Sequence, residues 1–215
     1  MTFVLALTGS IAMGKSTASD VFRAFGLPVF DADAAVHRLF APHGAARDPV
    51  LAAFPGCRDD QGGIDRRSLG RLVYDDPRAL ARLEGIVHPL VRAEQKRFLA
   101  RQAAARQPLA VLDIPLLYET GGERLVDAVA VVSAPAFLQA RRVLRRPGMT
   151  KERFDAILAR QIPDRIKCKR ADFVIETGLG KRRSIDAIAR IVDRVKPKRG
   201  TAWPDRWLSA ARRRH

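Results

Sequence analysis

The chain has 215 residues, 47% of them hydrophobic, and a formal net charge of +16. This length allows one substantial hydrophobic core but hardly two independent ones, so we expect a single α/β domain that carries insertions. No uncharged run is long enough to span a membrane and no charged leader precedes the first apolar run, so we expect a soluble, cytoplasmic protein. Cys57 and Cys168 lie far apart and fit neither a metal site nor a disulfide framework.

The positive charge is concentrated in two segments. Residues 1–136 are nearly balanced, whereas residues 137–170 hold 11 Lys and Arg against three Asp and Glu, and residues 181–215 hold 12 against three. The first segment has the pattern of a mobile helical cover over an anionic substrate, and the second is expected to fray. A generally arginine-rich proteome would give a similar tail. Aromatic residues make up 7% and are scattered, so we expect no specific nucleic-acid binding.

A phosphate-binding loop follows the first apolar run. The run Phe3–Leu7 predicts a buried strand, and the next residues read G-S-I-A-M-G-K-S-T. The glycines of this loop let the backbone curl so that several N–H groups point at one anion. The alternative interpretation is a glycine turn that only connects the strand to the helix. The predicted nucleotide-binding residues are Gly9, Ser10, Ile11, Ala12, Met13, Gly14, Lys15, Ser16 and Thr17. Lys15 would pair with the β- and γ-phosphates of ATP and Ser16 would bind Mg²⁺.

The remaining apolar runs alternate with helical patterns. A helix over Lys15–Phe25 comes first, and strands are expected at Pro28–Phe30, Leu109–Leu112, Ala128–Val132 and Phe173–Ile175. Strand alternating with helix indicates an α/β fold with a doubly wound, five-stranded parallel sheet.

Two long connections interrupt this pattern. Residues 34–107 hold helical pieces near Ala35–Phe40, Arg67–Tyr74, Pro77–Val87 and Pro89–Ala105, which indicates a substrate-binding insertion. Residues 136–170 form the basic second excursion. The closing segment, 196–215, has weak periodicity and no structure is predicted for it.

Carboxylates follow two of the predicted strands. Asp31 and Asp33 end the second, and Asp113 ends the third. The carboxyl ends of parallel strands line the ligand crevice, so Asp113 is predicted to help hold Mg²⁺ and Asp33 to accept a proton from a hydroxyl acceptor. Asp33 has an alternative role as the N-cap of the following helix.

Several motifs together resemble the dephospho-CoA kinase family. These are the phosphate-binding loop, D-A-D at Asp31–Asp33, L-E-G-I-V-H-P-L-V at Leu83–Val91, L-D-I-P-L-L-Y-E at Leu112–Glu119, Q-A-R-R-V-L-R-R at Gln139–Arg146, Gln161, and A-D-F-V-I at Ala171–Ile175. The resemblance covers residues 2 to about 195. It implies ATP- and Mg²⁺-dependent phosphorylation of the ribose 3′-hydroxyl of dephospho-CoA, the last step of coenzyme A synthesis, by a monomer or weak homo-oligomer.

The resemblance also implies a domain plan and further site residues. Residues 1–33, 108–135 and 171–195 would be the nucleotide-binding core, 34–107 the acceptor-binding domain, 136–170 a lid and 196–215 a basic tail. The catalytic residues would be Lys15, Asp33 and Arg142. Arg142 and Arg145 would clamp polyphosphate, Thr177 would lie near the adenine, and the acceptor would meet Asp33, His88, Leu116 and Glu119. Each of these contact residues also has a structural alternative. His88 and Glu119 could be residues at the start of a helix, and the two arginines could belong to a solvated basic helix.

One departure concerns the adenine. The family often has Asn before a Gly after the last strand, where this chain has Thr177 and no Asn at any position. Base recognition would then rest on backbone groups or Thr177. The lack of Asn also excludes the N-K-x-D motif of a GTP-binding switch. A nucleoside or nucleotide kinase with another acceptor, and a nucleic-acid-binding module, remain as alternatives.

Overall fold

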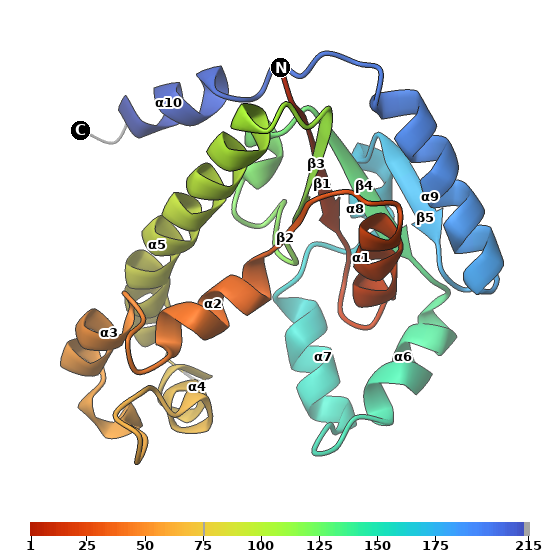
Figure 1. The fold of residues 1–215 in the computed structure, drawn as a ribbon. Helices are drawn as coiled ribbons and strands as arrows, with labels where there is room; N and C mark the ends of the chain where they lie inside the picture. The colour runs from red at the N-terminus through yellow and green to blue at the C-terminus, as the bar shows by residue number, and fades with distance from the viewer. Residues whose placement is uncertain (75, 213–215) are drawn as a thin grey trace. The chain divides into compact units, whose positions relative to one another are not determined.

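A computed structural model describes residues 1–74 and 76–212 (Figure 1). The chain divides into two compact units, one made of Met1–Phe30 with Leu99–His215 and the other of Asp31–Phe98. Each has its own hydrophobic cluster. The expectation of one core was therefore wrong, because the insertion is long enough to bury apolar side chains within itself.

The first unit is built on a five-stranded sheet with the order β2-β3-β1-β4-β5. The predicted strands are confirmed, with bounds β1 (Phe3–Thr8), β2 (Val29–Asp31), β3 (Leu109–Asp113), β4 (Ala128–Ser133) and β5 (Phe173–Glu176). β1 pairs in parallel with β3 and β4, and β4 pairs in parallel with β5. All residues of β1 and β3 are buried, as expected of central parallel strands covered on both faces.

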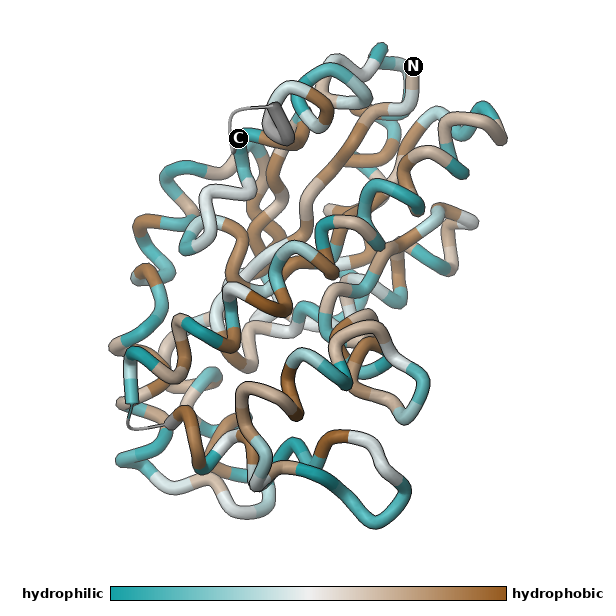
Figure 2. The backbone as a smooth tube through the Cα atoms, turned by 90° about the vertical axis from the view of Figure 1, so that its left-hand side faces the viewer, coloured by the Kyte–Doolittle hydropathy of each residue, from teal (hydrophilic) through white to brown (hydrophobic). Residues whose placement is uncertain are grey.

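Helices α1 (Lys15–Ala24) and α9 (Lys181–Val195) contact each other beside the sheet (Figure 1). Their apolar faces and the strands form one core cluster, in which Leu5, Leu7 and Phe22 are fully buried. The strands appear as the brown, hydrophobic interior of this unit in Figure 2. This packing fixes the carboxyl end of β1, from which the phosphate-binding loop leaves.

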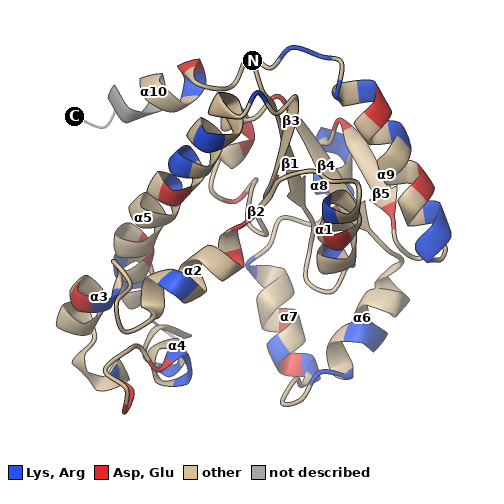
Figure 3. Cartoon of the chain, in the orientation of Figure 1, with Lys and Arg blue, Asp and Glu red and all other residues tan. Residues whose placement is uncertain are grey.

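The segment between β4 and β5 holds three helices. They are α6 (Ala136–Leu144), α7 (Lys151–Ala159) and α8 (Asp164–Arg170). Helices α6 and α7 contact each other, and Figure 3 shows Lys and Arg residues, in blue, on both. The Thr150 hydroxyl caps α7 by accepting from the Arg153 N–H at 3.3 Å. A short 3₁₀ helix, η2 (Gly122–Leu125), lies between β3 and β4.

The second unit is helical. It contains α2 (Ala32–Phe40), α3 (Arg47–Ala53), the turn η1 (Pro55–Cys57), α4 (Arg66–Tyr74) and most of α5 (Pro77–Ala104). Its core is centred on Ala46, Val50 and Cys57, which have no exposed surface. Burial raises the pKa of the Cys57 thiol, so it stays a protonated core residue.

The sequence predicted two helices here, with a break just before Pro89, but the structure has the single helix α5. It runs without interruption through this proline. Proline cannot donate to the carbonyl four residues earlier, which here belongs to Gly85. Both residues are exposed, so the Gly85 carbonyl that lacks this bond lies at the helix surface, where solvent can reach it.

The basic tail is ordered where no structure was expected. Helix α10 (Asp205–Arg212) follows a loop bound to the segment before β4. Trp207 is 2% exposed and its Nε1 donates to the Leu125 carbonyl at 2.7 Å. Asp127 accepts from the backbone N–H groups of Thr201 and Ala202 at 2.7 and 2.8 Å. Its second oxygen accepts from the Val4 N–H at 2.8 Å. Residues 213–215, at the expected frayed end, lie outside the described residues.

Over the described ranges, 1–74 and 76–212, no helix combines the length and apolarity that a membrane crossing requires.

Removing the Asp127 carboxylate is expected to release the tail. Asp127→Ala leaves the Val4, Thr201 and Ala202 N–H groups without their acceptor, and we expect a loss of about 3 kcal/mol in unfolding free energy. Urea unfolding followed by tryptophan fluorescence measures this loss, since Trp203 and Trp207 both lie in the tail. The control is Asp20→Ala, whose exposed pair with Arg23 should contribute within about 0.5 kcal/mol. Equal unfolding midpoints for the two variants would contradict the bond network.

Candidate active site

Two close approaches fix the phosphate-binding loop at its glycines. A Cβ on Gly9 would lie 2.3 Å from Cγ2 and 2.7 Å from the carbonyl oxygen of Val132, so no larger residue fits between the loop and β4. Gly14 has φ of 94°, and a Cβ there would lie 3.0 Å from the Thr177 hydroxyl oxygen. Glycine avoids both clashes and adopts the positive φ without strain. The loop geometry therefore depends on glycine at both positions.

The N-terminus of α1 presents its backbone donors to an anion. Gly14 is the N-cap and makes no side-chain capping bond, and the first turn has no acidic residue. Ser16 and Thr17 are exposed. The first N–H groups of a helix have no partner within the helix and carry the positive end of its dipole. Their chemistry fits phosphate.

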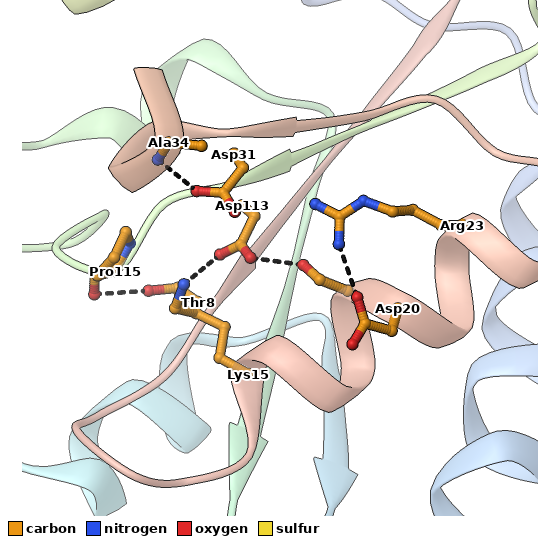
Figure 4. Close-up of polar contacts among 9 residues, drawn as sticks. Thr8, Lys15, Asp20, Arg23, Asp31, Ala34, Asp113 and Pro115 are labelled. Carbon is orange, nitrogen blue, oxygen red and sulfur yellow. Dashed lines mark hydrogen bonds and ion pairs between the residues drawn. The ribbon is translucent and has the colours of Figure 1, made fainter. Parts of the chain in front are cut away.

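Lys15 is held by a buried carboxylate. Its Nζ lies 2.5 Å from Oδ1 of Asp113 (Figure 4), and Oδ2 of Asp113 accepts from the Ser19 hydroxyl at 2.5 Å. The side chains of Lys15 and Asp113 are 17% and 3% exposed. Removing either member of such a pair leaves a poorly solvated charge. The pair therefore fixes the ammonium beside the phosphate-binding loop.

Arg142 and Thr177 contact the same loop from its outer side. Arg142 donates to the carbonyl of Ala12 at 3.4 Å and to the carbonyl of Thr177 at 2.9 Å. The Thr177 hydroxyl donates to the Met13 carbonyl at 2.5 Å. Ala12 has φ of 58°, a left-handed conformation that non-glycine residues seldom adopt, and these bonds hold the carbonyls around it. Both residues thus hold the backbone of the loop in this structure.

Two glutamines bind the peptide groups of Ile11. The Ile11 N–H donates to Oε1 of Gln161 at 3.1 Å, and the Ile11 carbonyl accepts from Nε2 of Gln139 at 2.9 Å. Gln139 lies on α6 and is 5% exposed, and Gln161 lies between α7 and α8. The segment predicted as a lid is therefore bonded to the phosphate-binding loop at two places, near its start and between α7 and α8.

The residues around Lys15 fit a magnesium ion held largely by phosphate and water. In the part of the chain that the structure describes, no three His, Cys, Asp or Glu side chains gather into a metal cluster. The Ser16 hydroxyl is exposed at the start of α1, and Asp113 already binds Lys15 and Ser19. Mg²⁺ typically keeps several waters and takes one or two protein ligands besides substrate phosphates. Ser16 suits direct coordination and Asp113 suits contact through water.

In the second unit, the capping role belongs to Asp31. Oδ1 of Asp31 accepts from the Ala34 N–H at 2.9 Å and caps α2 (Figure 4). Asp33 is the second residue of that helix and is exposed. The alternative of Asp33 as N-cap is therefore wrong, because the helix begins at Ala32, two residues earlier than an N-cap at Asp33 would require.

The other predicted contact residues lie in different surroundings. His88 is exposed on α5, and Leu116 and Arg145 are exposed in the first unit. Glu119 instead faces the interior, where its Oε1 lies 2.8 Å from Nζ of Lys167. The neighbouring Tyr118 is buried, and this burial raises the pKa of its hydroxyl to about 12.

Sequence reasoning missed several side chains that organise this site. Ser19, Gln139 and Lys167 are almost fully buried and polar. Ser19 lies one helical turn after Lys15, so its face on α1 gave a usable signal. Gln139 and Lys167 have no such signal, because polar residues in a basic helical segment are usually solvated.

The comparisons with known proteins identify the family. A family model described as dephospho-CoA kinase matches residues 3–180. The chain belongs to the dephospho-CoA kinase family. The predicted enzyme class is thereby confirmed, as a phosphotransferase that uses ATP on a small-molecule substrate.

Relatives and a solved structure agree over most of the chain. A dephospho-CoA kinase from Mesorhizobium japonicum is 52% identical over 198 residues, which are 92% of this chain and 99% of the relative. One from Paramagnetospirillum magneticum is 63% identical over 161 residues, 75% and 76% of the two chains. A crystal structure from Thermus thermophilus has a TM-score of 0.80 at 35% identity and covers 90% of this chain and 97% of its own. The predicted α/β fold with a doubly wound, five-stranded parallel sheet is confirmed.

A methyl group at Gly9 is expected to deform the loop. In Gly9→Ala the new carbon meets Val132 at 2.3 Å, so we expect a loss of about 1–3 kcal/mol in stability and strongly weakened ATP binding. Thermal unfolding and titration with a fluorescent ATP analogue measure the two effects. Gly85→Ala is the matched control. Gly85 lies within α5, and a Cβ there would have no heavy atom within 4 Å outside the backbone of its own helix. This variant should gain about 0.5–1 kcal/mol in unfolding free energy. Normal ATP affinity in Gly9→Ala would contradict the close approach.

Proposed function

We propose that the chain transfers the γ-phosphoryl group of ATP to the ribose 3′-hydroxyl of dephospho-CoA, giving coenzyme A and ADP in the final step of coenzyme A biosynthesis. Family membership over residues 3–180 supports the substrate pair. The observation that carries the chemistry is the buried pair of Lys15 and Asp113 beside the open N-terminus of α1. A fixed ammonium and convergent N–H groups stabilise charge on transferring phosphate.

On the nucleotide side, positioning is the main task of the protein. The loop residues Gly9–Thr17 bind the phosphates through backbone donors, and Lys15 contacts the β- and γ-phosphates. Arg142 holds the loop through Ala12 and Thr177, and we propose that it also meets the phosphates, with Arg145, when nucleotide binds. Bidentate guanidinium donors suit this role. Mg²⁺, bound at Ser16 and near Asp113, would neutralise phosphate charge.

On the acceptor side, we propose Asp33 as the general base. As the 3′-hydroxyl oxygen bonds to the γ-phosphorus, the bond from that phosphorus to the β–γ bridging oxygen breaks, and Asp33 takes the hydroxyl proton. The exposure of Asp33 and the capping of α2 by Asp31 support this assignment. Such a base contributes about 10²–10⁴-fold to the rate.

The domain plan follows from these roles. We propose that residues 1–33, 108–135 and 171–195 bind ATP, that 34–107 bind dephospho-CoA with contacts from His88, and that 136–170 act as a lid. Leu116 is proposed as a further acceptor contact. We propose a monomer or weak homo-oligomer that works in the cytoplasm, which fits an enzyme of coenzyme A biosynthesis, and that binds no specific nucleic acid.

Product analysis tests the proposed reaction directly. Incubation with Mg²⁺-ATP and dephospho-CoA is expected to give coenzyme A, detected by mass, and one ADP per product molecule. Adenosine, nucleoside monophosphates and other hydroxyl acceptors serve as parallel substrates. Folded protein that makes no coenzyme A, or that prefers another acceptor, would contradict the proposal.

Substitution of Asp33 tests the base. In Asp33→Asn we expect kcat to fall by about 10²–10⁴-fold with little change in KM for ATP, since the amide cannot take the proton. Lys15→Ala should instead lower kcat and raise KM for ATP together. Asp48→Asn is a matched control, because Asp48 is also the second residue of a helix and is 83% exposed. Near-normal kcat in Asp33→Asn would exclude this residue as the base.

A further inference from the structure

A buried ion pair lies outside the catalytic groups just assigned. Lys167, on α8, has no exposed side-chain surface, and its Nζ lies 2.8 Å from Oε1 of Glu119, whose side chain is 14% exposed. Within the described structure, the Lys167 Nζ is buried and its contact with Glu119 does not have hydrogen-bond geometry. Oε2 of Glu119 is also buried and has no hydrogen-bond partner there. Desolvating two charges in this way rarely adds to stability over an apolar pair. The pair therefore needs another explanation.

Glu119 also holds the backbone at the start of α8. Its Oε1 accepts from the Ile162 N–H at 2.9 Å, so one oxygen binds both Lys167 and the residue just after Gln161. Helix α8 is anchored a second time, because Oδ2 of Asp164 accepts from the Ser133 hydroxyl at 2.6 Å. Residues 162–167 are thereby fixed against the loop after β3 and the end of β4.

This anchoring places Gln161. The residue next to the held Ile162 N–H is the one whose Oε1 accepts from the Ile11 N–H of the phosphate-binding loop. The Ile11 carbonyl is bound by Gln139, on α6 near the start of the lid segment. A continuous series of contacts thus runs from Lys167 through Glu119, Ile162 and Gln161 to Ile11.

We propose that Glu119 and Lys167 are positioning residues, which set the conformation of the phosphate-binding loop by holding Gln161 against the Ile11 N–H. This inference rests on the proposed phosphoryl transfer and assigns Glu119 a role on the nucleotide side rather than the acceptor contact expected from the family resemblance. A loop held from outside keeps its N–H groups aimed before ATP arrives. Preorganised donors are worth more than donors that must reorient.

The test compares four variants with a matched control. Lys167→Met and Glu119→Gln each leave one buried charge, whereas the double variant leaves none and retains an amide oxygen for the Ile162 N–H. Gln161→Leu removes the acceptor of the Ile11 N–H. The control is Lys151→Met, which makes the same substitution in the exposed pair of Lys151 and Asp155 on α7, 2.7 Å apart.

Two measurements are made on each protein. Hydrogen–deuterium exchange at the Ile11 amide reports the loop in the absence of substrates, and steady-state kinetics give KM for ATP and for dephospho-CoA separately. We expect Lys167→Met, Glu119→Gln and Gln161→Leu to speed exchange and to raise KM for ATP, each by about tenfold, with KM for dephospho-CoA unchanged. The double variant of Glu119 and Lys167 should recover to within about threefold of wild type, and Lys151→Met should match wild type.

Each outcome decides the assignment. Lower melting temperatures with unchanged exchange and KM for ATP would show a purely structural pair and overturn the proposal. A rise in KM for dephospho-CoA in Glu119→Gln alone would return Glu119 to the acceptor site and also overturn it. The exchange measurement needs neither acceptor nor turnover, so it remains decisive even if the proposed reaction itself fails.

Discussion

The pairing of Lys15 with the buried Asp113 is the interaction on which the site depends. One carboxylate at the end of β3 takes an ammonium from the phosphate-binding loop and a hydroxyl from Ser19 on α1. It therefore joins the central strand pair to helix α1. The four methylene groups of a lysine side chain rotate freely unless its ammonium is bound. Here the Asp113 carboxylate, which is 3% exposed, holds the Lys15 ammonium in place. The sheet supplies this rigidity, because β1 and β3 are buried along their whole lengths.

Around that pair, the backbone of the loop is held from outside by side chains distant in sequence. Gln139, Gln161, Arg142 and Thr177 bind the polar groups of Ile11, Ala12 and Met13. Most of these donors and acceptors belong to the segment between β4 and β5. Movement of that segment and the shape of the phosphate site are thus physically linked, because the same hydrogen bonds belong to both.

Periodicity and motif together predicted the sheet and the phosphate-binding loop, since buried parallel strands are continuous apolar runs and the loop has fixed glycines. The interruption expected at Pro89 and the lack of structure expected in the tail were wrong. The helix continues through Pro89 at an exposed position, where a lost backbone hydrogen bond can be replaced by solvent, and the tail is ordered because Asp127 and Leu125 bind it. The pairing of Glu119 with Lys167 could not be predicted. Glu and Lys are usually exposed to solvent, and a single sequence does not indicate which of them are buried together.

The Asp127 carboxylate links the beginning of the chain to its end. One oxygen binds Val4 in the first strand and the other binds Thr201 and Ala202, nearly two hundred residues later. During synthesis the first strand therefore exists long before the segment that completes its surroundings. A chain cleaved before Thr201 would leave Asp127 with one of its three backbone donors, the Val4 N–H of the central strand β1. These bonds can therefore form only after Thr201 and Ala202 have emerged from the ribosome.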